Sequence, residues 1–192
     1  MKTARKKLGR LPGDLTKEEL ISRIIRVDQA GEYGAKRIYE GQLSVLGDSE
    51  DGPLLREMAD KENSHLETFN KLMVERRVRP TLLSPLWHFA GFALGAGTAL
   101  MGREAAMACT VAVEEVIEEH YANQAALLAF EEEPELLATI EKFREEEIDH
   151  KEAALAQGAE QAPGYPILAS VVKSGSRPVS YTHLTLPTIL LV

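Results

Sequence analysis

The sequence is poor in cysteine, in strand-forming patterns and in positive charge. Its single cysteine, Cys109, excludes an internal disulfide framework and a zinc site built on Cys-x-x-Cys motifs. Strand signals are almost absent before the last fifteen of the 192 residues, so the expected fold class is all-α. The net charge of −8 is opposite in sign to that of a protein that holds nucleic acid by its overall charge. Nucleic acid is therefore not an expected partner.

Proline and glycine divide the chain into four long predicted helices, at 15–46, 53–77, 103–131 and 134–157. Residues 15–177 are expected to form one domain. Residues 1–14 are expected to be a basic flexible arm, because the first ten residues include five basic and no acidic side chains. Residues 178–192 contain two prolines, no Asp, Glu, Lys or Arg, and no helical periodicity. We expect them to be an atypical tail, and whether that tail is native is left open.

The segment 80–102 is uncharged and apolar. It has 23 residues between Arg79 and Arg103, and a membrane span needs about 20. Pro80, Pro85 and several glycines argue against a spanning helix. We expect a hydrophobic hairpin that lies on a membrane surface, with Trp87 as an interfacial anchor. The alternative is a buried crossover within a helical bundle.

Each of the four predicted helices carries a glutamate on its apolar stripe. These residues, found at steps of three and four among apolar neighbours, are Glu32, Glu62, Glu114 and Glu147. A lone buried carboxylate costs several kcal/mol, so something must compensate all four.

The spacing of these glutamates indicates metal binding. The second and fourth helices each contain Glu-x-x-His, which places both side chains on one helix face. One glutamate from each of two helices and Glu-x-x-His from each of the other two is the ligand set of di-iron and di-manganese carboxylate bundles. Oxygen-rich ligand sets favour iron or manganese. Iron is the expected metal, because its redox chemistry would give the buried ligands a function. The predicted ligands of two iron ions are Glu32, Glu62, His65, Glu114, Glu147 and His150.

Three further residues are candidates for contacts around the metal ligands. Asp28 lies one turn before Glu32 and is placed to accept a hydrogen bond from a ligand imidazole; the alternative is an acid on the helix surface. Tyr121, with His120 beside it, lies two turns beyond Glu114, and the alternative for it is an ordinary core tyrosine. Glu115, Glu118 and Glu119 are expected mostly to form a solvated face; the alternative for Glu118, which is close to the face of Glu114, is a role as an alternate ligand.

Two segments, RIIRVDQAGEYGAKRIYEGQ at 23–42 and FALGAGTALMGREAAMACTVAVEEVIEEHYANQ at 92–124, resemble the demethoxyubiquinone hydroxylase family of ubiquinone biosynthesis. The resemblance covers residues 20–177. It implies a ferritin-like four-helix bundle with a hydrophobic helical crossover and a di-iron centre. The implied reaction hydroxylates the ring of a polyprenyl demethoxyquinol with dioxygen and electrons that trace to NADH. The family's iron ligands fall on the six residues already named. An apolar pocket, roofed by 80–102, would admit the ring.

The resemblance also implies partners and a location. It implies peripheral attachment to a membrane, on the cytoplasmic face of a bacterial inner membrane or the matrix face of the mitochondrial one. A lipid-binding partner protein of the same pathway is implied, and a homo-oligomer is left open. Two rival functions share parts of this pattern. A ferroxidase or peroxidase would use the same ligands but would not need the uncharged crossover, and a non-catalytic membrane-associated adaptor would keep the glutamates for structure.

Overall fold

The computed structural model describes residues 14–185, and these form six α-helices and one short 3-10 helix, without a β-strand. The elements are α1 Lys17–Leu46, α2 Gly52–Glu75, α3 Ser84–Leu100, α4 Arg103–Leu128, α5 Pro134–Ala156, η1 Ala159–Gln161 and α6 Tyr165–Thr185. The all-α prediction is confirmed. The four long predicted helices correspond to α1, α2, α4 and α5. The expected basic arm lies outside the described residues, apart from Asp14.

Local signals in the sequence explain where the long helices begin. Thr16 caps α1 through a capping box, in which the Glu19 backbone N–H donates to Thr16 Oγ1 (3.1 Å) and Thr16 N–H donates to Glu19 Oε2 (2.9 Å). Both α2 and α5 have proline in the first turn, where its missing N–H is not needed. The helix predicted at 103–131 ends at Leu128, three residues early.

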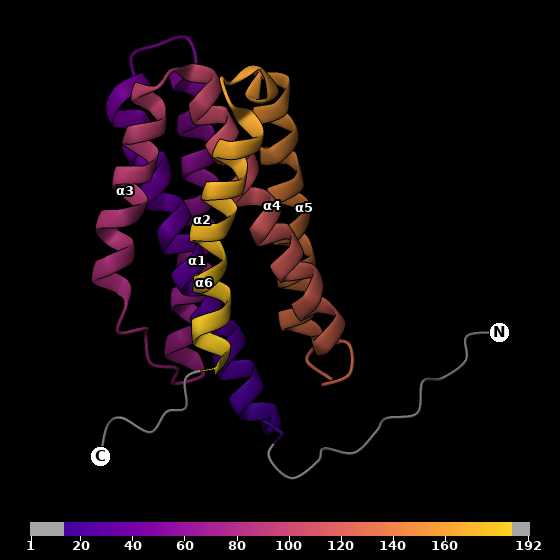
Figure 1. The fold of residues 1–192 in the computed structure, drawn as a ribbon. Coiled ribbons are helices and arrows are strands. Elements are labelled where there is room, and N and C mark those ends of the chain that lie inside the picture. Colours follow the sequence, from indigo (N-terminus) through magenta and orange to yellow (C-terminus); the bar gives the residue numbers. More distant parts are fainter. Residues whose placement is uncertain (1–13, 186–192) are drawn as a thin grey trace, which may run out of the picture.

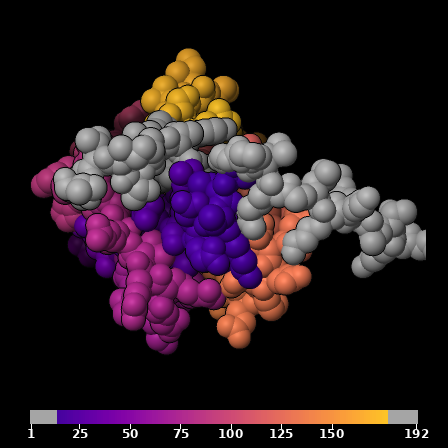
Figure 2. Space-filling model, turned by 90° about the horizontal axis from the view of Figure 1, so that it is seen from below, coloured from indigo at the N-terminus to yellow at the C-terminus, as the bar shows by residue number. Residues whose placement is uncertain are grey.

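Helices α1, α2, α4 and α5 form the bundle, with α3 along one side and α6 across the front (Figure 1). One end of the core combines Ile25, Phe69, Tyr121 and Ile140, one residue from each bundle helix. Viewed from below, the start of α1 lies between the α2–α3 connection, in magenta, and the α4–α5 connection, in orange (Figure 2). The expected bundle with a helical crossover is therefore present.

The crossover is a single helix, so the expected hairpin is wrong. Pro85 lies in the first turn of α3 and does not interrupt it. The glycines of α3 bring its backbone against α1: a Cβ at Gly95 would clash with the Ile38 carbonyl, and one at Gly91 would lie 3.0 Å from the Gly34 carbonyl oxygen. Within residues 14–185, none of the helices combines the length and apolar character that crossing a bilayer requires.

Helix α6 was not predicted, and it runs past the expected boundary at residue 177. It follows Gly158 and Gly164, both with positive φ, which turn the chain back over the bundle. In its part up to Arg177, Ala169 and Val172 are buried against the core. Adding residues to a formed helix costs far less than nucleating one, so the helix continues to Thr185 without strong periodicity there. The rest of the expected tail, 186–192, lies outside the described residues.

Candidate metal centre

The six predicted ligands meet in the interior of the bundle. Glu32 comes from α1, Glu62 and His65 from α2, Glu114 from α4, and Glu147 and His150 from α5. All six side chains are buried, with at most 2 % of any residue exposed. Amphipathic periodicity turns each of these residues inward on its own helix, and the bundle then brings the four faces together.

The six residues form two overlapping groups of potential ligand atoms. Glu32 and His65 belong to one group, Glu114 and His150 belong to the other, and Glu62 and Glu147 belong to both. Within each group the atoms lie within 4.8 Å of one another. This arrangement can hold two cations with two shared carboxylates.

The imidazoles point their Nδ1 atoms at the carboxylates. His65 Nδ1 is 3.0 Å from Glu147 Oε1 and 3.5 Å from Glu32 Oε2. His150 Nδ1 is 3.1 Å from Glu62 Oε1 and 3.2 Å from Glu147 Oε2. Each histidine therefore presents the same ring nitrogen to the centre, as expected for two equivalent Glu-x-x-His motifs.

Three side chains around the centre orient these ligands. The Tyr39 phenol donates to Glu114 Oε1 at 2.8 Å, and the Tyr121 phenol donates to Glu32 Oε1. On the outer side, His65 Nε2 is 2.8 Å from Glu146 Oε2. Sequence analysis found Tyr121 but missed Tyr39 and Glu146. The apolar stripe of α1 contained Tyr39, but only its place opposite α4 reveals its partner.

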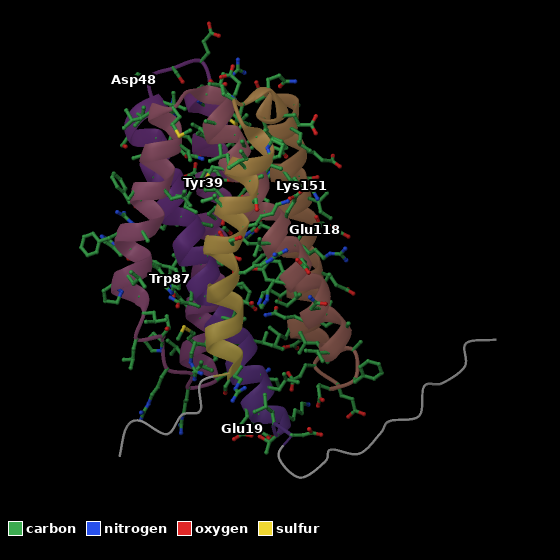
Figure 3. All side chains as sticks on the ribbon, viewed as in Figure 1. Glu19, Tyr39, Asp48, Trp87, Glu118 and Lys151 are labelled. Atoms are coloured by element: carbon green, nitrogen blue, oxygen red, sulfur yellow. The ribbon has the colours of Figure 1, made fainter. Side chains whose placement is uncertain are left out.

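Asp28 contacts an imidazole, but it is that of His120. Asp28 Oδ1 accepts a hydrogen bond from Gln124 Nε2 at 2.6 Å and lies 3.2 Å from His120 Nε2. The group is fully or largely buried beside the centre. Glu118, for which a role as an alternate ligand was the second possibility, pairs with Lys151 across the α4–α5 interface (Figure 3) and belongs to neither group of potential ligand atoms.

Burial shapes the protonation of the site. It raises the pKa of Glu62, Glu114 and Glu147, and the neighbouring carboxylates add to the effect. Burial alone lowers the pKa of His65, but its hydrogen bonds to Glu147 and Glu32 outweigh this and raise the pKa to about 10. Burial also raises the pKa of the Tyr39 and Tyr121 phenols, so both keep their protons and act as donors.

The donor set fits a pair of cations. Two buried carboxylate oxygens of the cluster, Glu62 Oε2 and Glu114 Oε2, have no hydrogen-bond partner among the described residues. Such atoms are rare in native proteins and call for an explanation. Cations that displace the protons of this site would meet four carboxylates and two neutral imidazoles, with a charge of about −4 that two divalent cations balance.

An apolar cavity of about 320 Å³ reaches the centre at Glu32. It lies between α1, α3, α4 and α6, and Trp87, Gly91 and Leu94 form its α3 wall, so the expected roof from segment 80–102 is confirmed. Asp28, His120 and Tyr121 also line it. A flat apolar ligand in this cavity would lie next to Glu32, one of the candidate metal ligands.

Comparisons with known proteins point to one family. The family model described as "Ubiquinone biosynthesis protein COQ7" matches residues 19–181. A Rhodospirillum rubrum protein named 3-demethoxyubiquinol 3-hydroxylase is 56 % identical over 169 residues, 88 % of this chain and 79 % of that protein. A Bos taurus protein named NADPH-dependent 3-demethoxyubiquinone 3-hydroxylase, mitochondrial, is 55 % identical over 172 residues, with the same two shares. A Saccharomyces cerevisiae protein named 5-demethoxyubiquinone hydroxylase, mitochondrial, is 44 % identical over 170 residues, 80 % of this chain and 73 % of that protein.

Proposed function

This chain belongs to the family of the ubiquinone biosynthesis protein COQ7 and is an enzyme that hydroxylates 3-demethoxyubiquinol, and we propose that it does so with two bound iron ions, dioxygen and electrons from a nicotinamide donor. The observation that carries the proposal is the pair of overlapping buried ligand groups that share Glu62 and Glu147. Iron bound there would supply the redox chemistry that activates dioxygen for insertion into the ring.

The protein's own contribution to the centre is charge balance and orientation. Glu62 and Glu147 would help to hold both ions, because they belong to both groups, while Glu32 with His65 and Glu114 with His150 would each hold one of them. Hydrogen bonds from Tyr39 and Tyr121 hold one oxygen of Glu114 and Glu32 and leave the other directed to the centre. Such outer contacts fix ligand geometry and affect metal affinity.

The apolar cavity would hold the quinol ring against Glu32 and exclude water from the reacting atoms. Asp28 and His120 are polar groups in its wall, and they are joined to each other. In this proposal the His120 imidazole exchanges a proton with a ring hydroxyl, and Asp28 orients the imidazole. Tyr121, His120 and Asp28 therefore act around the iron ligands and do not bind iron.

The polyprenyl tail requires a membrane. The outer face of α3 exposes Leu86 and Phe89, Leu82 is exposed just before the helix begins, and α3 also forms one wall of the cavity. We propose that α3 lies on the bilayer surface and lets the ring enter while the tail stays in lipid. The R. rubrum relative is bacterial and the B. taurus relative is named mitochondrial, so the proposed location is the bacterial or mitochondrial inner membrane. A lipid-binding partner protein stays a prediction.

The electron donor is either NADH or NADPH. The resemblance implied NADH, while the B. taurus relative is named NADPH-dependent. Assays with each donor separately decide between them.

The test is turnover with isotopically labelled oxygen. The iron-loaded protein is incubated with long-tailed 3-demethoxyubiquinol in liposomes, a reductant and ¹⁸O₂, and the product is analysed by mass spectrometry. The expected product carries one ¹⁸O atom in the new hydroxyl group. Chelated protein and Glu147→Ala protein serve as controls that should give none. Undiminished hydroxylation by the metal-free protein would contradict the di-iron proposal, and ¹⁸O-free product would contradict dioxygen as the source.

A further inference from the structure

Glycines within α1 and α3 are of two kinds. Gly41 of α1 and Gly95 of α3 mark a close approach of the two helices, because a Cβ at either position would clash with a backbone carbonyl of the other helix. Packing explains why these positions are glycine.

Gly31 and Gly34 have no such explanation. Both lie in the interior of α1, and a Cβ built at either one meets nothing within 4 Å. Glycine in a helix interior is destabilising relative to alanine, because it loses more backbone entropy on folding. Alanine would fit the protein alone at both positions and would stabilise the helix. The space left open must therefore serve something other than the packing of this chain.

That space belongs to the cavity beside the candidate metal centre. Gly31 and Gly34 flank Glu32 in sequence, and all three residues line the cavity. Trp87 lines it from α3, where Figure 3 shows it near the start of the helix, and its buried indole N–H has no hydrogen-bond partner among the described residues. An unpartnered buried donor favours a ligand that carries an oxygen atom.

We propose that Gly31 and Gly34 set the size of the ring that the cavity admits next to Glu32, a role that rests on the proposed function. The ligand class is a substituted, oxygen-bearing aromatic ring or its quinone. Methyl groups at positions 31 and 34 would occupy the space of the ring's own substituents. The two glycines are thus specificity-determining residues, and they lower the stability of α1.

The experiment compares stability with ring binding in single variants. The test variants are Gly31→Ala and Gly34→Ala. The matched control is Gly97→Ala on α3, where an added Cβ also meets nothing within 4 Å but where the residue does not line the cavity. Trp87 is the only tryptophan of the chain, so its fluorescence reports cavity occupancy. The probe is an oxidised, short-tailed demethoxyubiquinone, whose binding by the metal-loaded protein is read as quenching without turnover.

All three variants should raise Tm by about 1–4 °C, because alanine is the better helix former. Only the two test variants should bind the probe more weakly, by about tenfold or more. A ring that lacks the methoxy and methyl substituents should lose far less affinity in those variants. Unchanged probe affinity in both test variants, an equal loss in Gly97→Ala, or a lowered Tm would overturn the proposal. Wild-type protein that binds the probe but does not hydroxylate the quinol would contradict the proposed function alone.

Discussion

The phenol of Tyr39 on α1 donates a 2.8 Å hydrogen bond to Glu114 on α4, and both side chains are buried. Figure 3 shows Tyr39 in the upper half of the bundle. The bond leaves Glu114 Oε2 without a partner and directed to the candidate metal centre. One hydroxyl group thus couples the packing of two helices to the geometry of one ligand.

Removing that hydroxyl group should weaken metal binding. Tyr39→Phe keeps the ring but leaves Glu114 Oε1 without its donor, so we expect metal affinity to fall about 10- to 100-fold. Stability should fall by about 1–3 kcal/mol. Anaerobic Fe(II) titration and thermal unfolding measure the two effects. Tyr165→Phe, on α6 and away from the ligands, is the control that should change neither. Wild-type affinity in Tyr39→Phe would show that the bond does not orient the ligand.

The shared position of Glu147 predicts an unequal response of the ligands to mutation. Glu147→Ala should lose both iron ions, because the residue belongs to both ligand groups. Glu32→Ala removes a ligand from one group only and should retain about one ion. Iron quantitation and native mass spectrometry of the folded variants give the counts. Full iron occupancy in Glu147→Ala would overturn its assignment as a ligand.

The exposed face of α3 predicts membrane binding. Leu86 and Phe89 are 56 % and 72 % exposed, and glutamate at both positions should abolish co-flotation with liposomes and turnover of a long-tailed quinol. Iron content should not change. The matched control is a second Leu–Phe pair with the same spacing, Leu127→Glu with Phe130→Glu, which are 48 % and 45 % exposed at the end of α4. Retained binding and long-tail turnover in the α3 variant would show that α3 does not contact the membrane.

The single cysteine should be inert in the folded protein. Burial raises the pKa of the Cys109 thiol to about 12, and the side chain is inaccessible. A raised pKa lowers the thiolate fraction, here to about one in 10⁴ at pH 8 against about a quarter for a free cysteine. A thiol-reactive disulfide reagent at pH 8 should therefore label the protein only after it is unfolded. Rapid labelling of the native protein would contradict the buried position.

Truncation after Arg177 should leave the site intact. Among the α6 residues whose burial is described, which end at Arg177, Ala169 and Val172 are buried against the core. Iron content should match that of the full chain, and helical content by circular dichroism should fall by no more than the removed turns. Truncation after Gly164 removes the α6 wall of the cavity and should lower stability clearly. A loss of iron after truncation at Arg177 would show that the tail supports the bundle.

Much of the candidate site was predictable because its pattern is local. Two residues separated by three positions share a helix face whatever the fold, so Glu62 with His65 and Glu147 with His150 were found from spacing alone. The glutamate on each apolar stripe was found from helical spacing as well. The cost of burying a carboxylate then indicated that these four residues need a compensating partner. Proline and glycine are also local signals, and they placed the four long helices within a few residues of their observed ends.

The errors arose where a segment's structure depends on its neighbours. The apolar crossover was expected to be a hairpin because of its prolines and glycines, but Pro85 lies in the first turn of α3, and Gly91 and Gly95 serve the contact with α1. Helix α6 was not predicted, and its sequence beyond Arg177 lacks strong periodicity. Its position depends on the packing of Ala169 and Val172 against the other helices, which the sequence does not reveal.

Local periodicity and the cost of buried charge were enough to identify an all-α chain with two repeated ligand motifs, because both act within a single helix. The pairing of those motifs required the fold. Tyr39 meets Glu114 across 75 positions of the chain, Glu146 meets His65 across 81, and Tyr121 meets Glu32 across 89. Helical spacing carries no information on such partners, because the relative placement of two helices is set by how all of their side chains pack. The cavity has the same origin, since its walls come from four helices that meet only in the folded protein.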